Sequence, residues 1–218
     1  MSYRTVVDKI LRRLREDTLG SDWTGVLDDA SEADDYQKLI GDFVNEAKVM
    51  IEDAWQWSVL RTIESVTTVA STATYTLSGL DSRSRILQVF DETNDIMLKQ
   101  ISDAQFYHYT YVGATQEGQP TYYRLKDNTM SFWPTPDAAF SIKVHAVQPQ
   151  DDRTLAADTF KVQEALVVLG AYSLALSERG EDGGTGTDVA AGRFKDSLAD
   201  AITQDETRTI NETTWYAS

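Results

Sequence analysis

The chain has 218 residues, of which 41% are apolar and none is cysteine, and its formal net charge is −15. This length allows one large domain or two small ones, with enough apolar side chains to form a core. The absence of cysteine excludes disulfides, thiolate metal sites and cysteine nucleophiles. The acidic excess disfavours sequence-specific DNA binding, because Arg12, Arg13 and Arg15 are the only basic cluster.

Neither targeting nor membrane insertion is indicated. The N-terminal segment "MSYRTVVDKILRRLRED" has spaced apolar residues without a continuous apolar run, unlike a signal peptide. No stretch approaches the roughly 18–20 apolar residues of a membrane span. We therefore expect no membrane partner, and a location in the cytoplasm of a cell or in a particle assembled there.

The first part of the chain predicts two helices. Apolar residues spaced by three and four positions indicate a helix over about 5–16. A second stripe, starting at Tyr36, indicates a helix over about 33–55, with Ser31 and Asp34 as a capping-box variant at its start.

The period then changes to that of strands. "RTIESVTTV", "ATYTLSG", "SRILQVFDE" and "IMLKQI" are rich in β-branched residues or alternate, and the stretch from Phe140 to Ala146 alternates cleanly. "PTYYRLKDNTMSFWPTP" predicts a hairpin that turns at Asp127 and Asn128, and Ser102 opens a short helix. We expect six or seven strands within about 62–148.

Helical period returns for two more helices. The stretch from Phe160 to Glu178 is apolar almost all round, which predicts a helix buried on several sides, and an amphipathic helix follows over about 187–206. This order predicts an α+β fold: an α-helical bundle from N- and C-terminal helices with an inserted antiparallel β-lobe. The expected domains are 1–58 and 155–206 for the bundle, 59–150 for the β-domain and 207–218 for a C-terminal docking tail.

The glycine-rich loop between these helices, "SERGEDGGTGTDVAAGRF", raises the question of phosphate binding. It lacks the lysine of a P-loop, follows a helix and has an acidic flank. Gly180 suits the left-handed end of a helix, and Thr187 can cap the next one. We interpret the loop as a helix–helix connection that needs no nucleotide.

The sequence contains no recognisable set of catalytic or metal-binding residues. His145 lies on the polar face of a predicted strand, and His108 stands among tyrosines. With two histidines and no cysteine, common zinc sites and Cys–His or Ser–His–Asp chemistry are nearly excluded. We predict no catalytic residues, no cofactor and no metal.

The tryptophans give the candidate contact residues. Trp55 and Trp57 lie where helix gives way to strand, so they either lock the helices onto the β-block or anchor a neighbouring subunit. Trp215 and Tyr216 stand in an otherwise polar tail. Because exposed aromatic residues of this kind usually dock onto something, we expect them to bind a neighbour.

The pattern resembles a known family. "LIGDFVNEAKVMIEDAWQWSVLRT", "GQPTYYRLKDNTMSFWPTPDAAFSIKV" and "EALVVLGAYSLALSERGEDGG", in this order, resemble the head-to-tail adaptor (connector) proteins of tailed bacteriophages. The resemblance covers roughly Tyr36 to Ala201. It looks closest to the short-tailed phage group that includes tail tubular protein A.

This resemblance implies a non-enzymatic protein of the virion, at the head–tail junction. It implies a homo-oligomeric ring, typically of about twelve copies, that docks under the portal protein and offers its other face to the tail tube or nozzle. Genomic DNA would pass the lumen without sequence-specific binding. The resemblance also implies that Trp215 and Tyr216 dock on the portal, or else on an adjacent copy. The alternatives are a soluble monomeric binding domain, a tail accessory protein that forms no ring, or a small enzyme with an unrecognised site.

Overall fold

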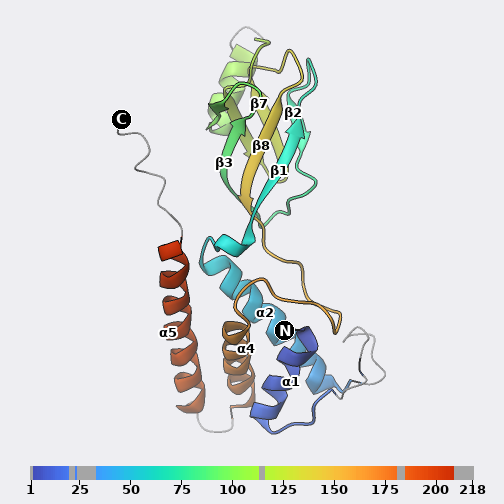
Figure 1. Cartoon of the computed structure of the whole chain (residues 1–218), viewed down its shortest axis with the longest axis vertical. Coiled ribbons are helices and arrows are strands. Elements are labelled where there is room, and N and C mark those ends of the chain that lie inside the picture. Colours follow the sequence, from blue (N-terminus) through green and yellow to red (C-terminus); the bar gives the residue numbers. More distant parts are fainter. Residues whose placement is uncertain (1, 20–22, 24–32, 113–115, 181–184, 209–218) are drawn as a thin grey trace. The chain divides into compact units, whose positions relative to one another are not determined.

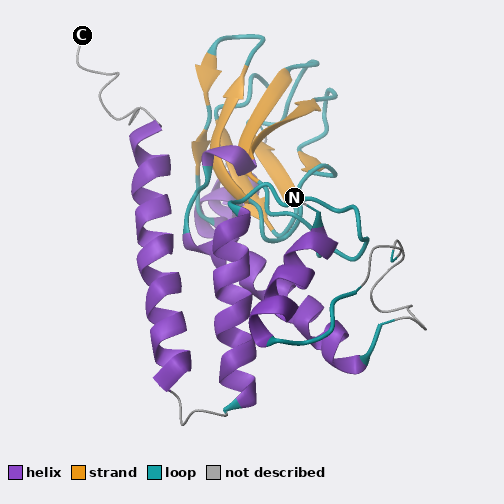
Figure 2. Cartoon of the chain, turned by 60° about the horizontal axis from the view of Figure 1, so that its bottom comes forward, coloured by secondary structure: helices purple, strands orange, loops and turns teal. Residues whose placement is uncertain are grey.

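The computed structural model describes residues 2–19, 23, 33–112, 116–180 and 185–208 (Figure 1). The chain forms two compact units, Met1–Leu60 with Gln150–Ser218 and Arg61–Pro149. The first unit is helical and the second contains two β-sheets, as the colouring of Figure 2 shows. The predicted α+β class is confirmed.

The helical unit is organised around one central helix. Its helices are α1 (Tyr3–Leu14), α2 (Asp35–Ala54), the 3-10 turn η1 (Ser58–Leu60), α4 (Glu164–Arg179) and α5 (Thr185–Arg208). Helix α4 packs against α1, α2 and α5, which explains why its sequence is apolar almost all round. A Cβ atom at Gly170 would lie 3.0 Å from the Cβ of Ala47 and 3.1 Å from the ring of Phe194, so glycine permits this close packing.

The helix boundaries differ from the expected ones for local reasons. Helix α1 ends at Leu14, because Arg15 takes a left-handed conformation with φ of 62°. Helix α2 is capped by Asp34, whose carboxylate accepts a hydrogen bond from the Gln37 amide at 2.7 Å. Ser31, predicted to form a capping-box variant with Asp34, lies outside the described residues. Helix α4 begins four residues after Phe160, which packs against the ring of Tyr3 instead.

The glycine loop also differs in detail. Gly180 ends α4 in the left-handed region with φ of 59°, as predicted, and its amide donates to the carbonyl of Leu176 at 3.1 Å. The predicted cap at Thr187 is wrong, because α5 already begins at Thr185. Residues 181–184, with two of the glycines, lie outside the described residues.

A loop distant in sequence is fixed to α2 by polar side chains. The Lys48 side chain is fully buried and donates to the carbonyls of Gln150 at 2.8 Å and Asp151 at 2.7 Å. Asn45 donates to the carbonyl of Arg153 and accepts from its amide. These bonds hold the chain in place where it re-enters the helical unit after residue 149.

The second unit contains two four-stranded sheets. One has the order β1 (Arg61–Thr67), β8 (Ser141–Val147), β3 (Arg85–Asp91) and β4 (Ile96–Met97). The other has the order β2 (Thr74–Thr76), β7 (Thr129–Trp133), β6 (Tyr122–Lys126) and β5 (Lys99–Gln100). Both contribute side chains to one apolar core, which includes Val89, Val144, Met130 and Phe132. The hairpin predicted at Asp127 and Asn128 is confirmed as the β6–β7 turn.

Two details of this unit correct the sequence prediction. The β-lobe is not wholly antiparallel, because β5 pairs in parallel with β6. The segment "IMLKQI" is two short strands in different sheets. Leu98 lies between these two strands and is buried in the apolar core. The chain therefore passes from one sheet to the other at a buried residue.

After β5 the chain forms α3 (Asp103–Tyr107) and a π-helical turn, η2 (His108–Val112). Ser102 caps α3 as predicted: its hydroxyl accepts from the Gln105 amide, and the Gln105 side chain accepts from the Ser102 amide. Thus the short helical element is encoded locally, by a capping box.

Candidate docking site

A groove crosses the helical unit over the outer face of α4. Its floor is a stripe spaced by four, three and four residues, which places all of its side chains on one side of the helix: Ala165, Leu169, Tyr172 and Leu176. The part between α4 and α5 has a volume of about 480 Å³, and the part beside α1 about 380 Å³. Such a shallow apolar floor suits a side-chain ridge of another protein better than an enclosed small molecule.

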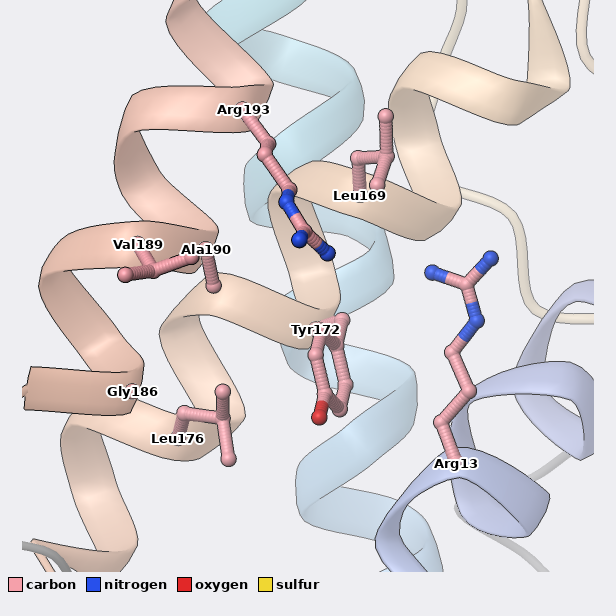
Figure 3. A pocket seen from close by; sticks show the side chains of 8 residues that line it. All are labelled: Arg13, Leu169, Tyr172, Leu176, Gly186, Val189, Ala190 and Arg193. Atoms are coloured by element: carbon pink, nitrogen blue, oxygen red, sulfur yellow. The ribbon is translucent and has the colours of Figure 1, made fainter.

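Arginine side chains flank this floor on both sides. Figure 3 shows Arg13 reaching in from α1 and Arg193 from α5, with Leu169 and Tyr172 between them. The Arg13 guanidinium carbon lies 5.7 Å from the centre of the Tyr172 ring, a cation–π distance. Lys9 and Arg12 extend the basic rim along α1. We call this surface, lined by these residues with Ala165, Leu176 and Val189, the basic groove.

The charge of the basic groove is opposite to that of the chain as a whole. Arg12, Arg13 and Arg193 are exposed, and within the described parts of the chain none of the three has an ion-pair partner. A guanidinium group offers five donors in a planar fork that matches a carboxylate. The basic groove can therefore bind an acidic ligand that also buries apolar side chains.

The two junction tryptophans both make hydrogen bonds within the helical unit. Trp57 is 3% exposed and donates from its indole nitrogen to the carbonyl of Ile51 at 2.6 Å. Half-buried Trp55 donates to the carboxylate of Asp205 at 3.2 Å. The same carboxylate accepts from the amide and hydroxyl of Ser58, so a residue of α5 fixes the end of α2. Whether either tryptophan meets a neighbouring subunit stays a prediction.

The other predicted contact residues, Trp215 and Tyr216, lie outside the described residues. Their docking role therefore stays a prediction as well.

An aromatic surface on the second unit was not singled out as a site from the sequence. Tyr111 and Val112 are 77% and 73% exposed, and Tyr107 stacks on Tyr111 with ring centres 5.8 Å apart. Behind them, Tyr109 stacks on Trp133 at 4.4 Å. Because rigid exposed tyrosines are frequent in protein interfaces, this tyrosine patch (Tyr107, Tyr111 and Val112) is a second candidate contact surface.

The histidines do not assemble a site. His108 is exposed beside Tyr109, and His145 is half-buried on β8, paired with Ile63 of β1. Among the described residues, no three histidine or acidic side chains are grouped so that they could hold a metal ion. No described helix is long and apolar enough to cross a membrane.

Comparison with models of protein families matches residues 1–215 to the SU10 adaptor protein family. None of the curated proteins compared matches the chain. Because the match covers nearly the whole length, the chain belongs to the SU10 adaptor protein family. It is thus a bacteriophage adaptor, a structural component of the virion. The comparisons do not show the closer similarity to tail tubular protein A.

Proposed function

We propose that this chain is a head-to-tail adaptor that forms a ring, dodecameric by the family resemblance, under the portal of a tailed phage. The ring extends the DNA channel and connects to the tail tube or nozzle, and the chain is not an enzyme. The observation that carries the proposal is the match of residues 1–215 to an adaptor family. By the resemblance stated above, we also place it with the short-tailed phage group that includes tail tubular protein A.

The charge of the chain supports this role. A protein with 35 acidic and 20 basic residues repels the DNA backbone wherever its acidic side chains dominate. Basic walls would bind phosphates, release counterions and slow the passage of DNA. An acidic lumen therefore lets genomic DNA pass without sequence-specific binding.

The candidate surfaces support assembly with other proteins. The basic groove lies on the helical unit and the tyrosine patch on the second unit, so each unit carries a surface of its own. An adaptor needs at least two kinds of contact, one to its own copies and one to the structures above and below. We propose that the helical bundle and the β-domain divide these contacts between them.

Ring formation is tested by measuring mass. Mass photometry of the purified chain, alone and mixed with purified portal, is expected to show a portal complex heavier by about twelve chains. If the mass of the portal does not increase at a saturating concentration of the chain, the proposal is contradicted. A gain of only one chain per portal would favour the alternative, a tail accessory protein or monomeric binding domain.

We further propose that residues 207–218, which begin with the last two residues of α5, form a docking tail with Trp215 and Tyr216 as its anchors on the portal. Burial of an aromatic anchor contributes about 2–4 kcal/mol at an interface hot spot. Ordering the backbone costs about 1–2 kcal/mol per residue, so two such anchors offset the ordering of only a few residues, and we expect only those next to Trp215 and Tyr216 to become ordered.

Truncation after Thr207 tests the tail. It is expected to leave the melting temperature of the free chain unchanged and to weaken attachment to portal-bearing heads. The double variant Trp215→Ala/Tyr216→Ala should reproduce the loss of attachment. If truncation unfolds the free chain instead, the tail belongs to the core and the docking role is wrong.

A further inference from the structure

A second charged surface runs along α2. Its four acidic residues are spaced by seven, four and seven positions, which brings them to one side of a helix with 3.6 residues per turn: Asp35, Asp42, Glu46 and Asp53. All four are exposed, and so is Met50, at 46%. Half-buried Leu39, Phe43 and Val49 lie beside them. We call these eight residues the acidic stripe.

The acidic stripe and the basic groove face away from each other. The buried side of α2, with Ile40, Val44, Ala47 and Ile51, lies opposite the acidic stripe on the helix, and Ala47 meets α4 at Gly170. The basic groove lies on the other side of α4, and Figure 3 shows α2 behind α4 when the groove is viewed from outside. One helical unit thus presents two different surfaces on opposite sides.

The two surfaces are complementary in charge and form. The floor of the basic groove extends from Ala165 to Leu176 of α4, about 18 Å, and α2 spans about 30 Å, so one can lie along the other. Arg13 and Arg193 stand on either side of an apolar floor, whereas the acidic stripe combines carboxylates with Met50 and Phe43. Carboxylates would pair with guanidinium groups while the apolar side chains are buried between them.

We propose that the acidic stripe of one copy docks into the basic groove of the next copy. Two different surfaces on one subunit make a heterologous, head-to-tail contact, which generates a ring when the rotation per copy closes. This inference rests on the proposed function and names the interface of its ring. It also gives the exposed Arg13 and Arg193 a binding role, as the groups that pair with the carboxylates of the next copy.

Cross-linking between single-cysteine variants tests this contact, because the chain has no native cysteine. Leu176→Cys marks the basic groove and Met50→Cys marks the acidic stripe. The two variants are mixed, both free at high concentration and on portal-bearing heads, and treated with a short bis-maleimide. We expect cross-linked dimers that contain one copy of each variant, and no dimers from either variant alone.

Charge exchange makes the test specific. Arg13→Glu/Arg193→Glu is expected to lower the cross-linking yield at least about tenfold, since like charges then face each other. Adding Asp42→Lys/Glu46→Lys to the partner copy should restore it. Lys195→Glu, on the same helix as Arg193 but outside the groove lining, is the matched control and should change nothing. Equal melting temperatures would show that the variants fold.

The inference is overturned if groove–stripe dimers form in neither setting, or if groove–groove dimers form instead. Rings that attach to heads without groove–stripe cross-links would contradict this interface and leave the proposed function intact. Groove–stripe dimers in solution that never attach to heads would support the interface and contradict the adaptor role.

Discussion

The two units of the chain differ in the contacts that hold them together. In the helical unit, buried charges join segments far apart in sequence: Lys48 bonds to residues 150–152, and Asp205 bonds to Ser58. In the second unit, the core is a cluster of apolar side chains, and the fully buried Asp91 bonds to its near neighbours Thr93 and Asn94. Both units have a buried apolar core, and neutral side chains such as Thr68 and Asn128 join distant segments of the second unit. The unit assembled from two separate chain segments thus adds buried charged groups to its long-range contacts, whereas the buried Asp91 of the continuous unit bonds locally.

The largest expected effect comes from Lys48→Met. The change removes the buried donor to the carbonyls of Gln150 and Asp151, and it removes the positive charge beside the buried carboxylate of Glu52. Breaking such a buried charged contact costs about 3–5 kcal/mol of unfolding free energy, measured in urea. Lys38→Met, which removes only an ion pair to the exposed Asp35, should cost about 0.5 kcal/mol or less. Hydrogen exchange should rise in the helical unit alone, and an equal rise in the second unit would break the comparison.

The same variant has a pH signature. Burial lowers the pKa of Lys48 from its ordinary value of 10.5, chiefly by desolvation, against the charges of Glu52 and Asp152. Between the lowered pKa and 10.5, the unfolded chain binds more protons than the folded chain. The free energy of unfolding therefore increases with rising pH across this window. Lys48→Met lacks this increase, so the difference in unfolding free energy between the variant and the wild-type chain should widen as the pH approaches 10.5. A deficit that narrows with pH would contradict the direction of the shift.

Met130→Ala probes the apolar core of the second unit. Met130 is fully buried on β7, so truncation leaves a cavity and should cost about 3 kcal/mol. Met97→Ala is the matched control, because Met97 is 49% exposed on β4 in the same unit and should cost about 0.5 kcal/mol or less. Equal losses of unfolding free energy for both would show that packing does not close this unit.

Asp205→Asn sharpens the comparison at the junction of α2 and α5. The amide retains one acceptor oxygen, whereas the carboxylate accepts from Ser58 and Trp55 through both of its oxygens. We expect a loss of about 1.5 kcal/mol in urea unfolding. Asp200→Asn, exposed on the same helix, should be neutral. If both substitutions are neutral, the Asp205 contacts do not hold the helical unit together.

The smallest effects come from two glycines near the α4–α5 connection. Gly180→Ala must keep φ of 59°, which costs about 1 kcal/mol for a residue with a Cβ. Gly192→Ala sits inside α5 with open space around its Cβ, so it should stabilise by about 0.5–1 kcal/mol. The melting temperatures of the two variants should shift in opposite directions from that of the wild-type chain. Shifts of the same sign would contradict the conformations assigned to the two glycines.

Elements encoded by neighbouring residues could be predicted from the sequence. Alternation from Phe140 to Ala146 indicated β8, the Asp127–Asn128 turn marked the β6–β7 hairpin, and Ser102 indicated the cap of α3. The division of "IMLKQI" between two sheets was not predictable, because alternation does not say which sheet a strand joins. Nor was the Asp34 cap distinguished from Ser31, since both positions carry capping residues.

The candidate docking site could be predicted only in part. The cluster containing Arg12 and Arg13 was visible as the only basic run in an acidic chain. Its partner Arg193 lies 180 positions further along, and only the packing of α1 and α5 on either side of α4 brings it to the same groove. The tyrosines around His108 were visible in the sequence, but sequence alone does not separate a core tyrosine from a surface one, so the exposed tyrosine patch could not be predicted.

Reconstruction of portal-bearing, tail-less heads by electron cryomicroscopy, before and after addition of the purified chain, tests the central claim most directly. We expect a new ring beneath the portal, with about twelve copies and an open channel on its axis. Arg13→Glu/Arg193→Glu should leave the portal without this ring, and Lys195→Glu should form it as the wild-type chain does. A portal vertex that stays bare with the wild-type chain would contradict the adaptor role.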